Sequence, residues 1–155
     1  SMTIENINLD YVVESTILNL EQEALRKDIK IESLVDKRIE VLSDFISLDI
    51  IISNYLNNAI AYSPNNSKIT ISAEEAYEKI KLSVKDEGEG IPENYKDRVF
   101  ERFFRVDKGR SLNQGGTGLG LSIVKNLAST LSSPVGVENQ EPNGASFWIE
   151  LDKST

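Results

Sequence analysis

The first third of the chain shows a helical and then a strand-like spacing of apolar residues. Over residues 8–28 apolar side chains recur every three or four positions, and Asn8 stands where a helix N-cap is expected. The apolar face of this predicted helix comprises Leu9, Val13, Ile17, Leu20 and Ala24. Shorter apolar stretches around residues 30–35 and 38–42 favour two strands. We expect this part of the chain to be scaffold.

A second helix is predicted over residues 46–62. Its apolar positions form a broad stripe made of Ile46, Ile50, Ile51, Leu56 and Ile60. Pro64 ends this helix, because a proline disfavours helical angles at the residue before it, Ser63. Two runs of alternating apolar residues then predict a β-hairpin over residues 68–86, namely Ile69, Ile71 and Ala73 followed by Ile80, Leu82 and Val84.

A long polar connection follows the hairpin. Residues 93–116 are mostly polar or charged, and a short helix is expected within them over residues 95–103. Connections of this length inside a compact domain are usually lids or binding loops. Three apolar residues are expected to hold it to the body of the domain: Phe100, Phe103 and Phe104.

The last quarter of the chain predicts one helix and two strands. Apolar residues at helical spacing place the helix over residues 118–131, and its expected buried face is Leu119, Ile123, Val124, Leu127 and Leu131. Alternating apolar residues predict strands near residues 135–137 and 147–151, separated by a Pro-Asn-Gly turn.

The composition is that of one folded domain. The chain has 155 residues, 39% of them hydrophobic and 27% charged, and we expect a single domain over residues 3–155. No apolar run is long enough to span a membrane, and no signal peptide is visible. Cysteine and histidine are both absent, which excludes disulfides, thiolate metal sites and any mechanism that uses a histidine of this chain.

The distribution of charge singles out one segment. A net charge of −8 argues against nucleic acid as the main partner. The segment from Lys96 to Arg110 departs from this balance, since its six basic and three acidic residues give it a local charge of +3. It immediately precedes a glycine-rich stretch, and a phosphate group would find its counter-charge there.

That glycine-rich stretch is Gly-Gly-Thr-Gly-Leu-Gly-Leu, residues 115–121. Uncovered backbone N–H groups at the start of a helix bind anions, so a nucleotide phosphate is the expected ligand. A Walker-type loop needs lysine where Leu121 stands, and a dinucleotide fingerprint needs a strand where residues 109–114 are polar loop. A tight turn that only packs a helix is the alternative interpretation.

Two further positions suit a nucleotide. Asn54 and Asn58 are four residues apart and share one face of the predicted helix, where their side-chain oxygens suit Mg2+. A pair of solvated amides has the same pattern. Asp86 ends the hairpin before Gly88 and Gly90, so its carboxylate can accept a hydrogen bond from an exocyclic amine such as that of adenine. An ordinary Asp-Gly turn is the alternative.

Four motifs in this order resemble those of one family. Asn54-Tyr55-Leu56-Asn57-Asn58-Ala59 resembles an N box, and Asp86-Glu87-Gly88-Glu89-Gly90-Ile91-Pro92 a first glycine box. Val99-Phe100-Glu101-Arg102-Phe103-Phe104-Arg105-Val106-Asp107 resembles an F box, and residues 115–121 a second glycine box. Together they are similar to the catalytic ATP-binding domain of bacterial sensor histidine kinases, in the GHKL (Bergerat) superfamily. Gyrase-type ATPases share the N and glycine boxes but are not expected to carry the F box.

The resemblance implies a fold and a set of contacts. The fold is an α/β (α+β) two-layer sandwich, a mixed and mostly antiparallel sheet packed on about three α-helices, with an ATP lid over about residues 91–116. Asp86 bonds the adenine amino group with Gly88 and Gly90 beside it, and Asn58, with Asn54, ligates Mg2+. The other expected ATP contacts are Tyr62, Ile91, Arg105, Arg110, Gly116, Thr117, Gly118, Leu119 and Gly120.

The resemblance also implies partners outside this chain. In such kinases the phosphoacceptor histidine lies on dimerisation helices of the same full-length protein, and an aspartate of a response-regulator receiver domain then takes the phosphoryl group. This chain has no histidine, so no residue in it is a convincing catalytic group and it is not expected to autophosphorylate alone. We expect a cytoplasmic domain of a membrane-anchored sensor.

Two positions depart from the family pattern. Ala61 stands where the family commonly has a basic residue that touches phosphate, and Leu131-Ser132-Ser133 replaces His-Gly-Gly. Ala61 supports one alternative function, a degenerate nucleotide-binding interaction module. An anti-sigma-type protein-serine kinase is the other alternative, and the F box argues against it.

Overall fold

The computed structural model describes residues 2–104 and 120–154. The strands are β1 (Ile4–Asn8), β2 (Lys30–Ser33), β3 (Glu40–Asp44), β4 (Lys68–Ala76), β5 (Lys79–Lys85), β6 (Val135–Asn139) and β7 (Ala145–Lys153). The helices are α1 (Leu9–Asn19), α2 (Glu21–Arg26), α3 (Phe45–Tyr62) and α4 (Gly120–Leu131), with a short 3-10 helix, η1 (Glu93–Tyr95).

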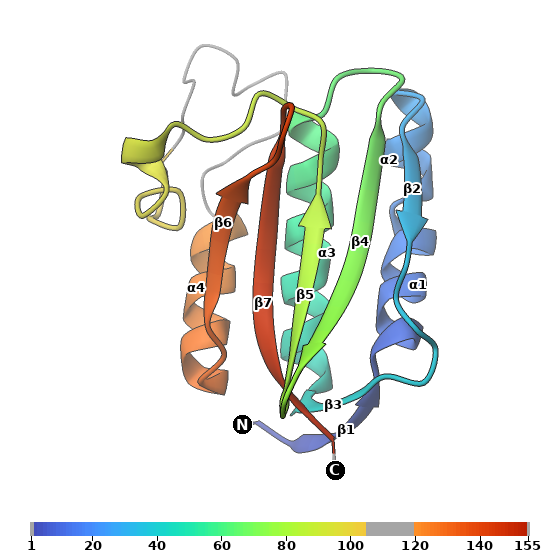
Figure 1. Ribbon diagram of the computed structural model, residues 1–155, viewed down its shortest axis with the longest axis vertical. Helices are drawn as coiled ribbons and strands as arrows, with labels where there is room; N and C mark the ends of the chain where they lie inside the picture. The colour runs from blue at the N-terminus through green and yellow to red at the C-terminus, as the bar shows by residue number, and fades with distance from the viewer. Residues whose placement is uncertain (1, 105–119, 155) are drawn as a thin grey trace.

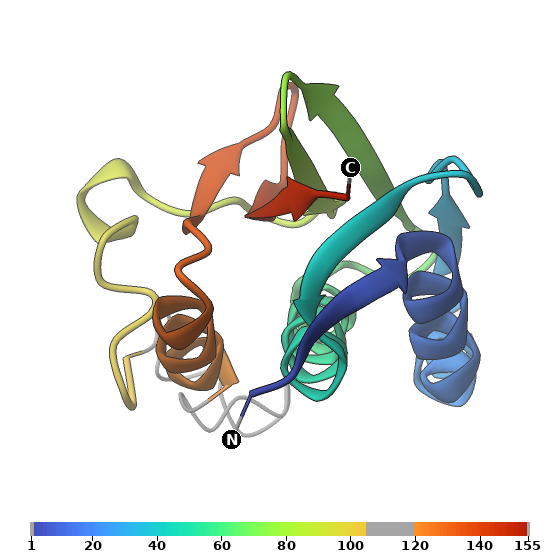
Figure 2. The same ribbon diagram turned by 90° about the horizontal axis from the view of Figure 1, so that it is seen from below.

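The seven strands form one sheet, and the four α-helices lie on one face of it (Figure 1, Figure 2). The strand order is β1-β3-β7-β5-β4-β2, with β6 paired to β7. Among the described strands only β2 and β4 run parallel. The predicted two-layer sandwich with a mixed, mostly antiparallel sheet is therefore confirmed.

The core lies between the sheet and α3. Inward residues of three strands face one another in rows, such as Val84, Phe147 and Val137, because side chains alternate between the two faces of a strand. Helix α3 packs on these rows with residues that are at most 5% exposed: Ser47, Leu48, Ile51, Ile52, Tyr55, Leu56, Ala59 and Ile60. The Tyr55 hydroxyl donates to the Trp148 carbonyl oxygen at 2.8 Å, which ties α3 to the centre of the sheet.

The opposite face of the sheet carries the only tryptophan of the chain, Trp148. Its indole covers Gly136 of the neighbouring strand, where a Cβ atom would lie 2.5 Å from the ring. The Lys81 ammonium lies 4.9 Å from the ring centroid and pairs with Glu138 at 3.2 Å. The aromatic side chain thus lies outside the layer that α3 covers.

The N-terminal third differs from the prediction in two ways. The single helix expected over residues 8–28 is two helices, because the chain leaves helical angles at Leu20 (φ −107°, ψ 10°) and Glu21 starts a new first turn. Strand β1 was not predicted, since only Ile7 of its five residues is buried and no alternation results. The cap is confirmed: Asn8 Oδ1 accepts from the Tyr11 N–H at 2.9 Å.

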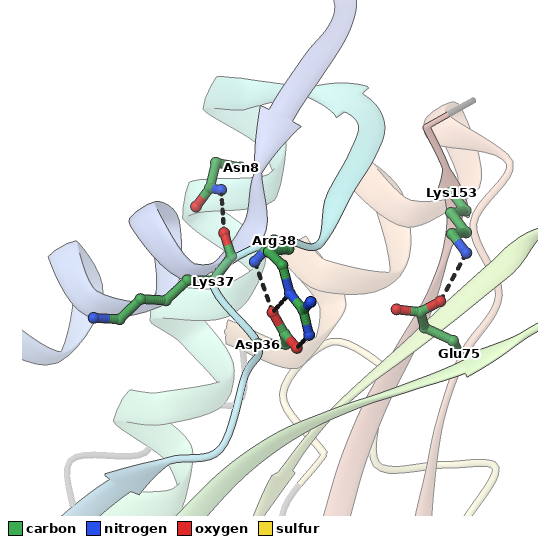
Figure 3. A network of polar contacts seen from close by, with 6 residues as sticks. All are labelled: Asn8, Asp36, Lys37, Arg38, Glu75 and Lys153. Atoms are coloured by element: carbon green, nitrogen blue, oxygen red, sulfur yellow. Dashed lines mark hydrogen bonds and ion pairs between the residues drawn. The ribbon is translucent and has the colours of Figure 1, made fainter.

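Polar contacts hold the turn that leads into β3 beside the start of α1 (Figure 3). Asn8 Nδ2 donates to the Lys37 carbonyl oxygen at 2.8 Å. Next to it, hydrogen bonds from the Arg38 guanidinium and from its backbone N–H lower the pKa of Asp36 to about 2. These groups are exposed, so we assign them a local ordering role.

Three apolar residues of the predicted helical stripes lie at the surface, whereas the others that the structure describes are buried or pack against the core. On α3, Ile46 is 70% exposed and Ile50 36% exposed. On α4, Ile123 is 43% exposed, whereas Val124 and Ala128 are buried. The core contact of α3 uses Ile51, Leu56 and Ile60 of the same stripe, and on α4 the predicted Val124 is buried together with Ala128. No helix of the described residues is long and apolar enough to cross a membrane.

The helix expected over residues 95–103 does not form. Apart from η1, the segment is a series of turns. Phe100 packs on Phe147 with ring centroids 6.1 Å apart, and Phe104 packs on Tyr95 at 5.3 Å. Phe103 is 61% exposed, so the expected contact with the body fails for that residue. The contact of Phe100 with the distant Phe147, and that of Phe104 with Tyr95, stabilise these turns in place of the predicted helix.

Candidate functional site

Helix α3 carries one end of the candidate site. Asn54, Asn58 and Tyr62 follow one another at four-residue spacing and therefore share a face of the helix. Asn54 Nδ2 donates to the Ile50 carbonyl oxygen at 2.9 Å, so the amide presents Oδ1 away from that bond. Asn58 is partly buried. The predicted placement of Asn54 and Asn58 on one helix face is observed, and Tyr62 extends that face to the end of α3.

The N-terminus of α4 meets Asn54. A Cβ atom added to Gly120, the first residue of α4, would lie 2.9 Å from Asn54 Oδ1. Any other residue at position 120 would displace this amide. An amide oxygen thus lies beside the positive end of a helix dipole, which favours anions. The other predicted residues of this region lie outside the described part of the chain: Arg105, Arg110, Gly116, Thr117, Gly118 and Leu119.

Asp86 forms the other end of the site, directly after β5. Its side chain is buried, with 6% of the residue exposed. Oδ1 accepts two hydrogen bonds, from the Gly88 N–H at 2.9 Å and from the Ala145 N–H at 3.2 Å. Burial raises the pKa of the Asp86 carboxyl, and the two amide donors oppose that rise. Since both bonds use Oδ1, Oδ2 is the oxygen left for a ligand donor.

The glycines after Asp86 fit the segment into a tight space. A Cβ atom at Gly88 would lie 2.6 Å from the Tyr62 carbonyl oxygen, so the segment rests on the end of α3. Gly90 has a φ of +81°, a conformation that other residues rarely adopt. Ile91 follows it, partly buried against the core. These positions agree with a flat ligand lying beside Asp86.

A lysine that the sequence did not indicate lies at the end of α3. Lys27 Nζ donates to the carbonyl oxygens of Ile60 and Ala61, at 2.7 and 3.1 Å. The charge therefore meets the negative end of the α3 dipole, next to the position where the family pattern has a basic residue. Sequence analysis missed it because Lys27 and Ala61 are far apart along the chain.

Helix α3 also sets the length of the site. Along α3, Asn54 lies beside the start of α4 and Tyr62 lies beside Gly88, and the two residues are about 12 Å apart at the ordinary helical rise. That span is comparable to an extended nucleoside triphosphate. Side-chain amide oxygens are ligands that Mg2+ accepts, so Asn54 and Asn58 are suited to hold this ion. The arrangement suits an adenine at Asp86 and phosphates beside Asn54 and the start of α4.

Comparison with known proteins identifies a family and several relatives of this chain. A family model described as histidine kinase-, DNA gyrase B-, and HSP90-like ATPase matches residues 43–155. The sensor-like histidine kinase SenX3 of Mycolicibacterium smegmatis is 36% identical over 148 residues, which are 96% of this chain and 38% of SenX3. The chain thus spans well under half the length of that relative.

The fold of this chain also resembles solved structures of histidine kinases. The nucleotide-free catalytic domain of histidine kinase ThkA matches with a TM-score of 0.86 at 28% identity, over 98% of this chain and 97% of that domain. Full-length ShkA, solved with AMPPNP, matches with a TM-score of 0.86 at 25% identity, over 100% of this chain and 32% of ShkA. ThkA has also been solved with a response regulator, TrrA. The motifs, the fold and the family model agree, and the chain belongs to the family of histidine kinase-, DNA gyrase B- and HSP90-like ATPases.

Proposed function

We propose that this chain is the catalytic ATP-binding domain of a two-component sensor histidine kinase. In this proposal it binds Mg·ATP and presents the γ-phosphate to a histidine on dimerisation helices of the same full-length protein. An aspartate of a response-regulator receiver domain then takes the phosphoryl group. The names of the relatives and the ThkA complex with TrrA support this assignment.

One structural observation supports Mg·ATP as the ligand of this chain. The buried carboxylate of Asp86 lies near the end of α3, where Gly88 packs on Tyr62. Eight residues earlier on the same helix, the amide oxygen Asn54 Oδ1 faces the start of α4. The Asp86 carboxylate suits the amino group of adenine, and the Asn54 amide oxygen suits a metal ion bound to phosphate. An Asp-Gly turn accounts for the bond from the Gly88 N–H to Oδ1, but it does not require the carboxylate to be buried and it does not use Oδ2, which is left for a ligand.

Each end of the site has a proposed task. Asp86 Oδ2 accepts a hydrogen bond from the adenine amino group, while Gly88 and Gly90 let the adjoining backbone pass close to Tyr62 and Asn139. Asn58 and Asn54 hold Mg2+, which supplies charge neutralisation at the phosphates when bound. Tyr62 and Ile91 flank the nucleotide. For the residues outside the described part, Arg105 and Arg110 are proposed to reach the terminal phosphates, and Gly116, Thr117, Gly118 and Leu119 to line the phosphate chain and base.

The chemistry of this chain is positioning. A ring nitrogen of the acceptor histidine attacks the γ-phosphorus, the bond to the β,γ-bridging oxygen breaks, and ADP leaves. Phosphoryl transfer needs in-line alignment and charge neutralisation more than it needs a covalent catalyst. The nucleophile comes from elsewhere, because this chain contains no histidine. We place the domain on the cytoplasmic side of a membrane-anchored sensor.

Calorimetric titration with a non-hydrolysable ATP analogue, with and without Mg2+, tests the proposal. Micromolar binding that tightens with Mg2+ is the expected result. Addition of the chain and ATP to a separate histidine-bearing dimerisation fragment of the same protein should label histidine, as an acid-labile phosphate. Acid-stable phosphoserine on a partner would instead identify the serine kinase alternative. Absence of nucleotide binding would favour the interaction module, with Ala61 as the first position to restore.

A further inference from the structure

The β6–β7 hairpin makes hydrogen bonds along the whole segment from Asp86 to Ile91. The turn joins β6 to β7, and Asp86 N–H donates to the Ala145 carbonyl oxygen at 2.9 Å. Asn143 Nδ2 donates to the Glu87 carbonyl oxygen at 2.8 Å. At the far end, Asn139 binds the backbone of Ile91. The segment that carries the proposed adenine acceptor is therefore held by a turn that is distant in sequence.

The contact between Asn139 and Ile91 is reciprocal. Asn139 Oδ1 accepts from the Ile91 N–H at 2.7 Å, and Asn139 Nδ2 donates to the Ile91 carbonyl oxygen at 2.7 Å. Because the backbone N–H can only donate and the carbonyl can only accept, one orientation of the amide satisfies both bonds. The contact thus fixes the position and the direction of the Ile91 peptide groups.

The backbone before Ile91 is shaped to admit this amide. A Cβ atom at Gly90 would lie 2.8 Å from Asn139 Oδ1, in addition to the strain that a φ of +81° imposes on other residues. Gly90 therefore gives Asn139 access to its neighbour. The first glycine box thus serves an internal contact of the domain.

We propose that Asn139 is a positioning residue for adenine recognition. This inference rests on the proposed function, in which Asp86 and Ile91 both contact the base. Ala145 fixes the Asp86 end of the segment, and Asn139 fixes the Ile91 end. Without Asn139 the Ile91 end must be ordered when the nucleotide binds, and that ordering reduces affinity. The effect falls on binding of the base and not on the phosphate end of the site.

Asn139→Ala is the direct test, with Asn143→Ala as the matched control. Asn143 has the same side chain, belongs to the same β6–β7 hairpin and bonds the same segment, but at Glu87, which has no proposed nucleotide contact. We expect Asn139→Ala to weaken ATP and ADP binding by the same factor, about fivefold to tenfold, with and without Mg2+. Asn143→Ala should change either affinity less than twofold. The readout is titration calorimetry of the chain with each nucleotide.

A second variant separates hydrogen bonding from volume. Asn139→Asp keeps the size and the acceptor for the Ile91 N–H, but places an oxygen against the Ile91 carbonyl oxygen. We expect it to weaken the binding of both nucleotides at least as much as Asn139→Ala, whereas amide hydrogen exchange at Ile91 should become faster in Asn139→Ala, which removes the acceptor of that N–H. If both variants fail to fold, Asn139 is a structural residue and the inference is wrong.

The outcomes separate this inference from the proposed function. If the unaltered chain binds neither nucleotide, the proposed function and the inference both fail. If the unaltered chain binds ATP and Asn139→Ala binds it within twofold, only the inference fails. An equal loss in Asn143→Ala would also overturn it, since general loosening of the turn would then explain the result. A loss seen only with Mg2+ would place the effect at the phosphates and contradict the assignment.

Discussion

Replacing Asp86 with asparagine tests the adenine acceptor most directly. In the folded chain Oδ1 accepts from the N–H groups of Gly88 and Ala145, at 2.9 and 3.2 Å. In Asp86→Asn the amide oxygen must keep those two bonds, so the NH2 group takes the place of Oδ2. A donor then faces the amino group of adenine, and the hydrogen bond to the base is lost.

The size of the effect follows from that exchange. A hydrogen bond with a charged partner contributes about 1.5–3 kcal/mol, which corresponds to a loss of roughly 10-fold to 150-fold in ATP affinity. Titration calorimetry at pH 7 measures it directly. Asp36→Asn is the control, because that carboxylate is paired with Arg38 away from the site and should leave ATP affinity unchanged. An Asp86→Asn affinity within twofold of the unaltered chain would refute the role of Asp86 in base recognition.

The same substitution separates recognition from stability. Burial raises the pKa of Asp86 above its ordinary value of 3.8, so the ionised carboxylate opposes folding at neutral pH, and this cost disappears as the pH falls below 3.8. Asparagine keeps both amide bonds and carries no charge. We expect the thermal unfolding midpoint of Asp86→Asn to equal or exceed that of the unaltered chain at pH 7, with the difference vanishing toward pH 3. A lower midpoint at pH 7 would show that the charge stabilises the fold.

Three more substitutions test the rest of the site. Asn58→Ala should bring ATP affinity measured with Mg2+ close to the value without it; calorimetry showing full Mg2+ dependence in this variant would remove Asn58 from the metal ligands. Ala61→Lys should tighten ATP binding about fivefold, roughly 1 kcal/mol, by adding a cation near phosphate; no gain would mean that another group already fills this role. Lys27→Met should cost about 1–2 kcal/mol of folding stability in urea unfolding, because the end of α3 loses a charge and two hydrogen bonds to Ile60 and Ala61. Stability is expected to fall without a change in ATP affinity, and a large loss of affinity would instead place the Lys27 charge in the site.

Local signals predicted the elements on which the site is built. Pro64 ends α3 as expected, with Ser63 extended at a ψ of 145°. The β4–β5 hairpin follows the alternation of its apolar residues, and Asp86 lies buried at its end. The order of the four motifs predicted the family, and the match over residues 43–155 confirms it.

Features that depend on distant contacts were not predictable in this way. The spacing of Ile123 suggested a core position, but Ile123 is 43% exposed, and Ala128, which the apolar stripe did not include, is buried beside the predicted Val124. Asn139 and Ile91 are 48 residues apart, and nothing near either residue indicates their pairing. Both cases depend on how segments that are distant in sequence pack together in the folded domain.

The single tryptophan offers an optical route to the affinity of this domain. Trp148 lies on the face of the sheet opposite α3, with its ring over Gly136, so its emission should report whether β6 and β7 are paired and stay constant when a nucleotide enters. A ligand that binds only the folded chain raises the unfolding free energy by RT ln(1 + [L]/Kd). Urea unfolding followed by fluorescence at several ATP concentrations therefore yields the dissociation constant from the protein's own signal, with no labelled nucleotide.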